Sequence, residues 1–258
     1  MRDPHVVALR YRLECDETLS FENPPLAEAQ TDAFRVSLHD DRLTAEMIEH
    51  YSTEEGARKR VETYLRSWEV DAALCSGRQE FRFQFESADV IDRDPPPPGS
   101  PQTVHVKGIA STVTFGTVTV HKKTRVYPAP PVGFVASPDV ETLWARYEGY
   151  LQGQEPLSSM AYACLTFLEA LAGGRKETAR QYNISQIVLG TLGRLSNELG
   201  DSQTARKFSR SRSPRLASGS EIAWMETAVK ALIRRVGEHA SDPTEQRPML
   251  TMHDLPAP

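Results

Sequence analysis

The feature that most constrains this chain is a change in hydrophobic periodicity near its midpoint. Before the proline-rich stretch 128–133, apolar residues recur at every second position, which is typical of half-buried β-strands. After it they recur every three or four positions, which is typical of amphipathic helices. Strands and helices that occur in separate blocks form segregated layers rather than βαβ units. We therefore predict an α+β protein: a mostly antiparallel sheet with one packed helix over residues 1–130, an all-α domain over 137–241, and a proline-rich tail over 242–258.

The first 130 residues predict about seven strands and one helix. Residues 34–47 read as a hairpin with its turn at 39–42, and the Val/Thr-rich stretches 103–115 and 117–127 suggest another. A capping box at Ser52 and Glu55 is expected to start the helix. The residues expected to face the core are Val7, Leu9, Tyr11 and Leu13 in the first strand, and Phe81, Phe83 and Phe85 in the strand after the helix.

In the second half, turn and cap residues separate the predicted helices. Ser137 followed by proline starts the first of them, and Gly173-Gly174 ends the second. A final helix is expected to begin near Ser220. Its apolar face is predicted to carry Ile222, Met225, Val229, Leu232, Ile233 and Val236.

Residues 175–199 have the spacing of a helix-turn-helix. Ala179 is small where two helices would cross, Asn183 suits the turn, and Ser185 can cap the second helix. This arrangement can place a helix in a DNA major groove. The exposed face would carry Gln186 and Thr191 toward base edges, with arginines near phosphates. Helical hairpins of this kind also occur in bundles that do not bind nucleic acid, and this structural interpretation stays open.

The same region is the most basic part of an acidic protein. Between residues 175 and 215, nine basic residues face three acidic ones, a net charge of +6, whereas the whole chain carries −5. Such asymmetry indicates an anionic partner, here DNA or RNA. A solvated Ser/Arg-rich loop or phosphorylation of its serines would also fit. The predicted nucleic-acid-binding residues are Arg180, Gln186, Thr191, Arg194, Arg206, Lys207 and Arg210.

A second motif lies in the final helix, where four residues separate Arg234 from His239. Together with its helical setting, it resembles the Arg-x4–6-His motif of the HEPN family of α-helical ribonucleases. The resemblance implies that Arg234 binds the scissile phosphate and that His239 acts as acid and base across a dimer. The chain departs from the family because no Asn follows Arg234. Basic residues that favour the dipole at a helix C terminus are the structural alternative.

Other signals limit the classes of function. The run 162–207, with Asp254-Leu255-Pro256, is similar to uncharacterised bacterial proteins, which implies a bacterial, cytoplasmic protein. No catalytic, metal or cofactor motif is evident, so we expect no cofactor, no metal, and a binding or regulatory role rather than an enzyme. The three cysteines form no CxxC pair, and no apolar run is long enough to cross a membrane. The N-terminal domain is expected to contact a protein partner. A purely structural or protein-interaction module is the remaining alternative, and the oligomeric state stays open.

Overall fold

The computed structural model describes residues 3–15, 19–21, 24–76, 81–94, 123–124, 126–199 and 216–258. It divides into two compact units, Met1–Val132 and Gly133–Pro258, called here the N-terminal unit and the helical unit. The first contains a five-stranded antiparallel sheet and one helix, and the described part of the second is helical, so the α+β prediction is confirmed.

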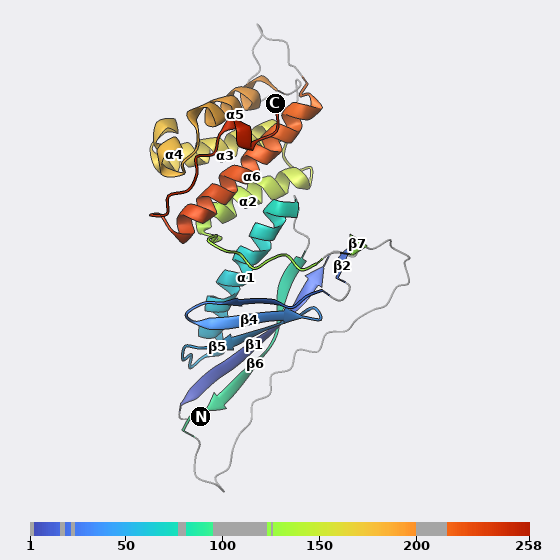
Figure 1. Ribbon diagram of the computed structural model, residues 1–258, viewed down its shortest axis with the longest axis vertical. Coiled ribbons are helices and arrows are strands. Elements are labelled where there is room, and N and C mark those ends of the chain that lie inside the picture. Colours follow the sequence, from blue (N-terminus) through green and yellow to red (C-terminus); the bar gives the residue numbers. More distant parts are fainter. Residues whose placement is uncertain are drawn as a thin grey trace. The chain divides into compact units, whose positions relative to one another are not determined.

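The sheet of the N-terminal unit has the strand order β3-β4-β5-β1-β6, and every neighbouring pair is antiparallel (Figure 1). The predicted hairpin is present, and its turn residues Asp40 and Asp41 have φ angles of +48° and +58°. Two further short strands, β2 (Leu19–Ser20) and β7 (Lys123–Thr124), form a parallel pair. The five strands of the sheet are β1 (Pro4–Cys15), β3 (Ala27–Gln30), β4 (Phe34–His39), β5 (Arg42–Met47) and β6 (Phe81–Asp92).

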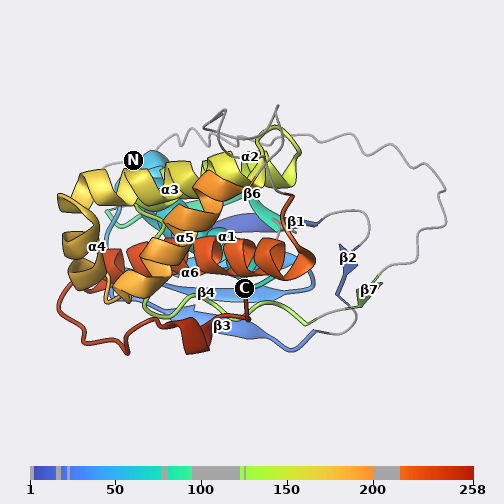
Figure 2. The same ribbon diagram turned by 90° about the horizontal axis from the view of Figure 1, so that it is seen from above.

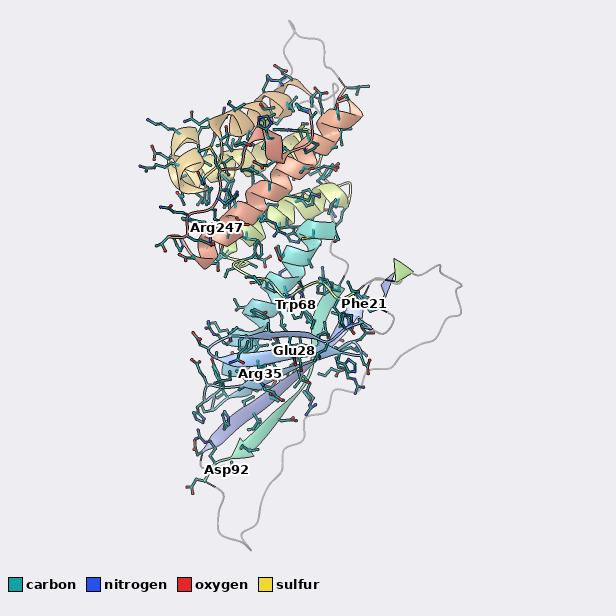
Figure 3. All side chains as sticks on the ribbon, viewed as in Figure 1. Phe21, Glu28, Arg35, Trp68, Asp92 and Arg247 are labelled. Carbon is teal, nitrogen blue, oxygen red and sulfur yellow. The ribbon has the colours of Figure 1, made fainter. Side chains whose placement is uncertain are left out.

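Helix α1 (Glu54–Ser76) packs on one face of this sheet and completes the core of the unit. Trp68 is fully buried in that core, and its indole Nε1 donates a hydrogen bond to the Pro128 carbonyl oxygen at 3.1 Å (Figure 3). The start of α1 differs from the prediction. Thr53 Oγ1, rather than the Ser52 hydroxyl, accepts a hydrogen bond from the Gly56 amide, because the helix begins one residue later than the capping box suggested.

The inward face of β1 also differs from strict alternation. Leu9, Tyr11 and Leu13 are buried as predicted, but Val6 is buried in place of Val7, which is 36% exposed. The pairing of β1 with β6 shifts register between Val6 and Ala8. A bulge of this kind inserts one residue and so moves the preceding side chains to the opposite face.

The helical unit contains five α-helices in its described part (Figure 2). Ser137 caps the first, with its hydroxyl accepting from the Val140 amide, and Gly173 ends the second with a φ of +87°. Both features match the prediction, whereas Ile222, predicted to be buried, is partly exposed. The helices are α2 (Pro138–Leu151), α3 (Leu157–Ala172), α4 (Arg175–Gln181), α5 (Gln186–Glu198) and α6 (Gly219–Ser241).

The predicted proline-rich tail is an ordered part of the helical unit. Residues 242–258, called here the C-terminal strap, turn back after α6 and run along the helices (Figures 1 and 2). Leu250 and Leu255 are buried, and a short 3-10 helix (Met252–Asp254) lies between them. Because its apolar anchors are spaced along an irregular segment, they have no period that a sequence pattern could reveal.

Two further observations concern predicted elements. The strand predicted at 103–115 and most of that predicted at 117–127 lie outside the described residues. Among the helices of the described ranges, none is by itself long and apolar enough to cross a membrane. Only α3 and α4 taken together reach that composition, and they are bent by 82°.

Candidate nucleic-acid interface

Where the helix-turn-helix was predicted, the structure has two helices, α4 and α5, joined by a short turn. Asn183 has a φ of +50°, a left-handed conformation that asparagine tolerates better than most residues. Ser185 caps α5, and its hydroxyl oxygen accepts a hydrogen bond from the Ile187 amide at 3.2 Å. Ala179 is buried beneath the hairpin. The sequence signals for the turn and the cap therefore correspond to real local structure.

The C-terminal strap holds this turn, which the sequence did not indicate. The Ser185 amide donates to the Leu250 carbonyl oxygen at 2.8 Å, and the Leu250 amide donates to the Asn183 carbonyl oxygen at 2.9 Å. The Asn183 side chain also donates to the Arg247 carbonyl oxygen. These hydrogen bonds fix the angle at which α5 leaves the turn.

Helix α5 presents one exposed stripe along its length. Ile187 is 67% exposed, the Arg194 side chain is 52% exposed, and Gly190 and Thr191 between them are partly exposed. The opposite face is buried against the unit through Val188, Leu189, Leu192 and Leu195. Because residues three and four apart share a helix face, these positions form a continuous surface that begins at the exposed Gln186.

The two described arginines among the predicted binding residues are paired with carboxylates. Arg180 lies 2.5 Å from Glu177, and Arg194 lies 3.0 Å from Glu198. The part of the basic segment that is described, 175–199, therefore carries a net charge of only +2. The remaining +4 belongs to residues 200–215. Arg206, Lys207 and Arg210, predicted to bind nucleic acid, lie among them and outside the described residues.

A polar pocket of about 340 Å³ lies between the end of α4, the end of α6 and the strap. It brings together Arg180, predicted to contact phosphate, and His239, the acid–base residue of the ribonuclease alternative. His239 packs edge-on against Tyr182, with ring centroids 5.3 Å apart. Burial, and then the charge of Asp139, raise the pKa of Tyr182. Its phenol therefore stays protonated near neutral pH.

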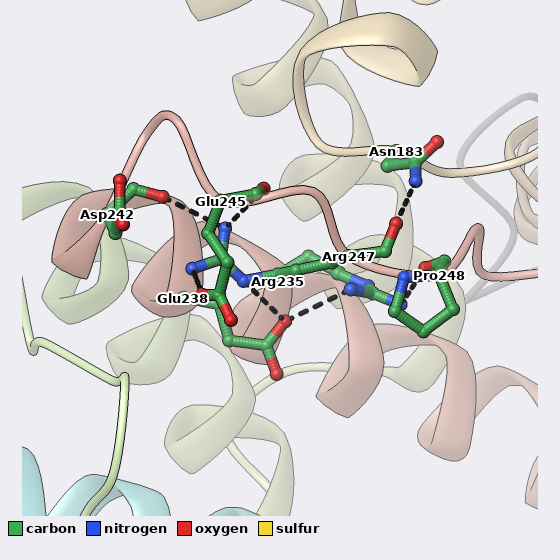
Figure 4. Close-up of polar contacts among 7 residues, drawn as sticks. All are labelled: Asn183, Arg235, Glu238, Asp242, Glu245, Arg247 and Pro248. Atoms are coloured by element: carbon green, nitrogen blue, oxygen red, sulfur yellow. Dashed lines mark hydrogen bonds and ion pairs between the residues drawn. The ribbon is translucent and has the colours of Figure 1, made fainter.

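Two arginines that the sequence patterns did not single out also line this pocket. Glu238 Oε2 lies 3.2 Å from Arg235 Nη1 and 3.8 Å from Arg247 Nε, so one carboxylate holds both guanidinium groups (Figure 4). Arg235 Nη2 donates to the Pro248 carbonyl oxygen at 2.6 Å, and Arg247 pairs with Glu245. Arg235 could have been found from its spacing to His239, because residues four apart share a helix face.

Arg234 does not line the pocket that contains His239. Each residue of an α-helix advances by about 100°, so a separation of five residues turns the two side chains roughly 140° apart. Within one chain the predicted pair therefore does not converge. The ribonuclease alternative requires the two residues to meet across a dimer, and it stays a prediction.

In the described ranges, no three His, Cys, Asp or Glu side chains gather in a way that could hold a metal ion. The protein matches no protein-family model, no curated protein and no solved structure. The candidate interface therefore depends on its own geometry and charge.

Proposed function

We propose that the helical unit binds nucleic acid through α4, the turn and α5. The observation that carries the proposal is the exposed stripe of α5, which follows a capped turn held by the strap and includes Arg194; Arg180 is exposed on the preceding helix α4. A helix with a free face and a fixed approach angle fits the major groove of duplex DNA. The deep, narrow major groove of duplex RNA does not admit it.

The ion pairs along the stripe do not oppose this function. Exposed pairs between arginine and carboxylate stabilise a protein by only about 0.2–1 kcal/mol. The release of counterions from DNA favours each new arginine–phosphate contact by mass action at low salt. Arg180 and Arg194 can therefore leave Glu177 and Glu198 for phosphates, while Gln186 and Thr191 contact base edges and Ile187 contacts thymine methyl groups.

The test is a titration of fluorescent duplex DNA with the full chain, followed by anisotropy at about 50 and 200 mM salt. Wild type is expected to bind with steep salt dependence. The double variant Arg180→Glu/Arg194→Glu should bind far more weakly and lower the salt slope by roughly two. Arg146→Glu is the matched control, because Arg146 is an exposed, ion-paired arginine of α2 outside the stripe.

A second double variant, Arg206→Glu/Lys207→Glu, measures the contribution of the remaining basic residues. If Arg180→Glu/Arg194→Glu binds like wild type, or wild-type binding does not depend on salt, the hairpin is structural and the proposal fails. The acidic remainder of the chain is then best assigned to protein contacts. If the proposal holds, the helical unit binds nucleic acid and the N-terminal unit binds a protein partner.

One observation favours RNA cleavage as a second candidate. His239 lies in a pocket with three arginines, where a histidine can exchange protons beside a bound phosphodiester. A His239→Ala variant should then lose cleavage of single-stranded RNA while it keeps RNA binding. Arg234→Ala, which removes the residue expected to bind the scissile phosphate, should weaken both cleavage and RNA binding. Cleavage that persists in both variants would exclude this pair.

A further inference from the structure

We propose that the polar pocket at the ends of α4 and α6 binds the phosphate group of a phosphate monoester. Three guanidinium groups line it, from Arg180 on α4, Arg235 on α6 and Arg247 on the strap, against a single lining carboxylate, Glu245. Its volume of about 340 Å³ falls within the roughly 300–1,000 Å³ typical of small-ligand pockets. The geometry therefore suits a ligand the size of a mononucleotide rather than a bare ion.

The guanidinium groups of Arg235 and Arg247 are held in place, and Arg235 still has donors to offer. Their side chains are only 14% and 12% exposed, and Glu238 fixes both from a position outside the pocket lining. Arg235 uses two of its five N–H groups in hydrogen bonds to Glu238 and Pro248. Glu238 and Glu245 balance the two guanidinium charges, so a dianionic phosphate that takes the place of the exposed Glu245 can form bidentate hydrogen bonds with them.

The other carboxylates near the pocket are ones that a phosphate can displace. Glu245 pairs with Arg247 from an exposed position on the strap, and Glu177 pairs with Arg180, whose side chain is 83% exposed. The exposed Arg180–Glu177 pair contributes little to stability. The Glu245–Arg247 pair costs more to break, because the Arg247 side chain is only 12% exposed. A phosphate that enters the pocket replaces these two carboxylate contacts with contacts to three arginines.

The remaining lining suits the rest of a nucleotide. Gln181 and Gln246 are among the lining residues and carry amide groups, and the rings of Tyr182 and His239 offer aromatic surface. A free mononucleotide and the phosphorylated end of a nucleic-acid strand share this chemistry. In the second case the pocket extends the proposed nucleic-acid interface, since Arg180 belongs to both.

The experiment compares adenosine 5′-monophosphate with adenosine by isothermal titration calorimetry on the full chain at constant ionic strength. We expect the monophosphate to bind about tenfold tighter and inorganic phosphate to compete with it. Arg247→Gln and Arg180→Gln should each remove most of this preference, whereas Arg146→Gln should keep it. Because Arg180 is almost fully exposed, its substitution leaves the fold intact even if Arg247→Gln loosens the strap.

A second arm compares an oligonucleotide that carries a 5′-phosphate with the same strand ending in a hydroxyl. A preference confined to the oligonucleotide assigns the pocket to strand ends, and an equal preference for the mononucleotide assigns it to free nucleotides. Arg194→Glu separates this proposal from the DNA interface, because it should weaken duplex binding and leave mononucleotide binding unchanged. The proposal is overturned if neither the mononucleotide nor the oligonucleotide binds better with its phosphate than without it, or if the preference is unchanged in both arginine variants. The arginines are then only anchors of the strap.

Discussion

Substitution of Gly237 by alanine tests the close packing of Phe134 on the backbone of α6. Gly237 lies in α6, where the Phe134 ring packs directly on the helix backbone and the Val135 amide donates to the Gly237 carbonyl oxygen at 3.1 Å. A Cβ atom at this position would lie 2.2, 2.5 and 2.8 Å from three carbons of that ring. Phe134 is itself buried, so its ring cannot move without disturbing its neighbours.

Two opposing effects determine the size of the change. Alanine is favoured over glycine in a helix by about 1 kcal/mol. Overpacking of a buried contact costs about 1–3 kcal/mol. Because three ring atoms overlap the new methyl group, we take the upper part of that range and expect a net loss of roughly 1–2 kcal/mol. Gly190→Ala is the matched control, since no atom lies within 4 Å of its added Cβ. It should stabilise the unit by up to about 1 kcal/mol.

The assay is urea unfolding followed by tryptophan fluorescence. Trp144 and Trp224 lie in the helical unit and Trp68 in the N-terminal unit, so a Trp68→Phe background reports on the helical unit alone. In a Phe134→Leu background the penalty of the alanine should shrink or vanish, because the overlapping ring is gone. If Gly237→Ala is as stable as wild type, or its cost is unchanged in the Phe134→Leu background, the steric argument is wrong.

Two further predictions concern local structure. Asn183→Ala should lower the free energy of unfolding by about 1–2 kcal/mol, because alanine is strained at a φ of +50°. Asn183→Gly should lower it by less, since glycine adopts this conformation without strain. Equal losses in urea unfolding would show that only the side-chain contact to the strap matters. The pKa of His5 is lowered by burial, then by His50 and Arg93, so its NMR titration midpoint should lie below 6.5 and should rise in a His50→Gln variant. Below pH 6.5 the unfolded chain then binds more protons than the folded one, so the free energy of unfolding should decrease as the pH is lowered. A titration midpoint at or above 6.5 would contradict this.

Local signals in the sequence predicted the elements well where one residue type determines one feature. The Asn183 turn, the Ser185 cap and the Gly173 helix end all depend on backbone geometry that few residues supply. The predictions were wrong where strand pairing or tertiary contacts determine which side chains are buried. The bulge near Val7 depends on the register with β6, and no pattern within β1 records it.

The pocket could not be predicted for the same reason. Arg180, Arg235 and Arg247 come from three segments, and only the folded strap brings the third to the other two. Spacing to His239 singled out Arg234 in the sequence, yet helix geometry places Arg235 on the shared face. A motif defined by spacing alone therefore selected the neighbour of the residue that lines the site.

Shape and charge at the proposed interface come from adjacent parts of the chain. The described hairpin supplies a rigid, exposed helix face, but its arginines are largely balanced by Glu177 and Glu198. Most of the positive charge belongs to residues 200–215, which follow α5 directly. If α5 selects the site and these residues provide affinity, substitutions in the two segments must act differently. Changes at Gln186 should reduce discrimination between DNA sequences with little effect on the salt slope, and changes at Arg206 and Lys207 should weaken binding to all sequences alike. If the helical hairpin is only structural, changes at Gln186 should not alter discrimination between DNA sequences.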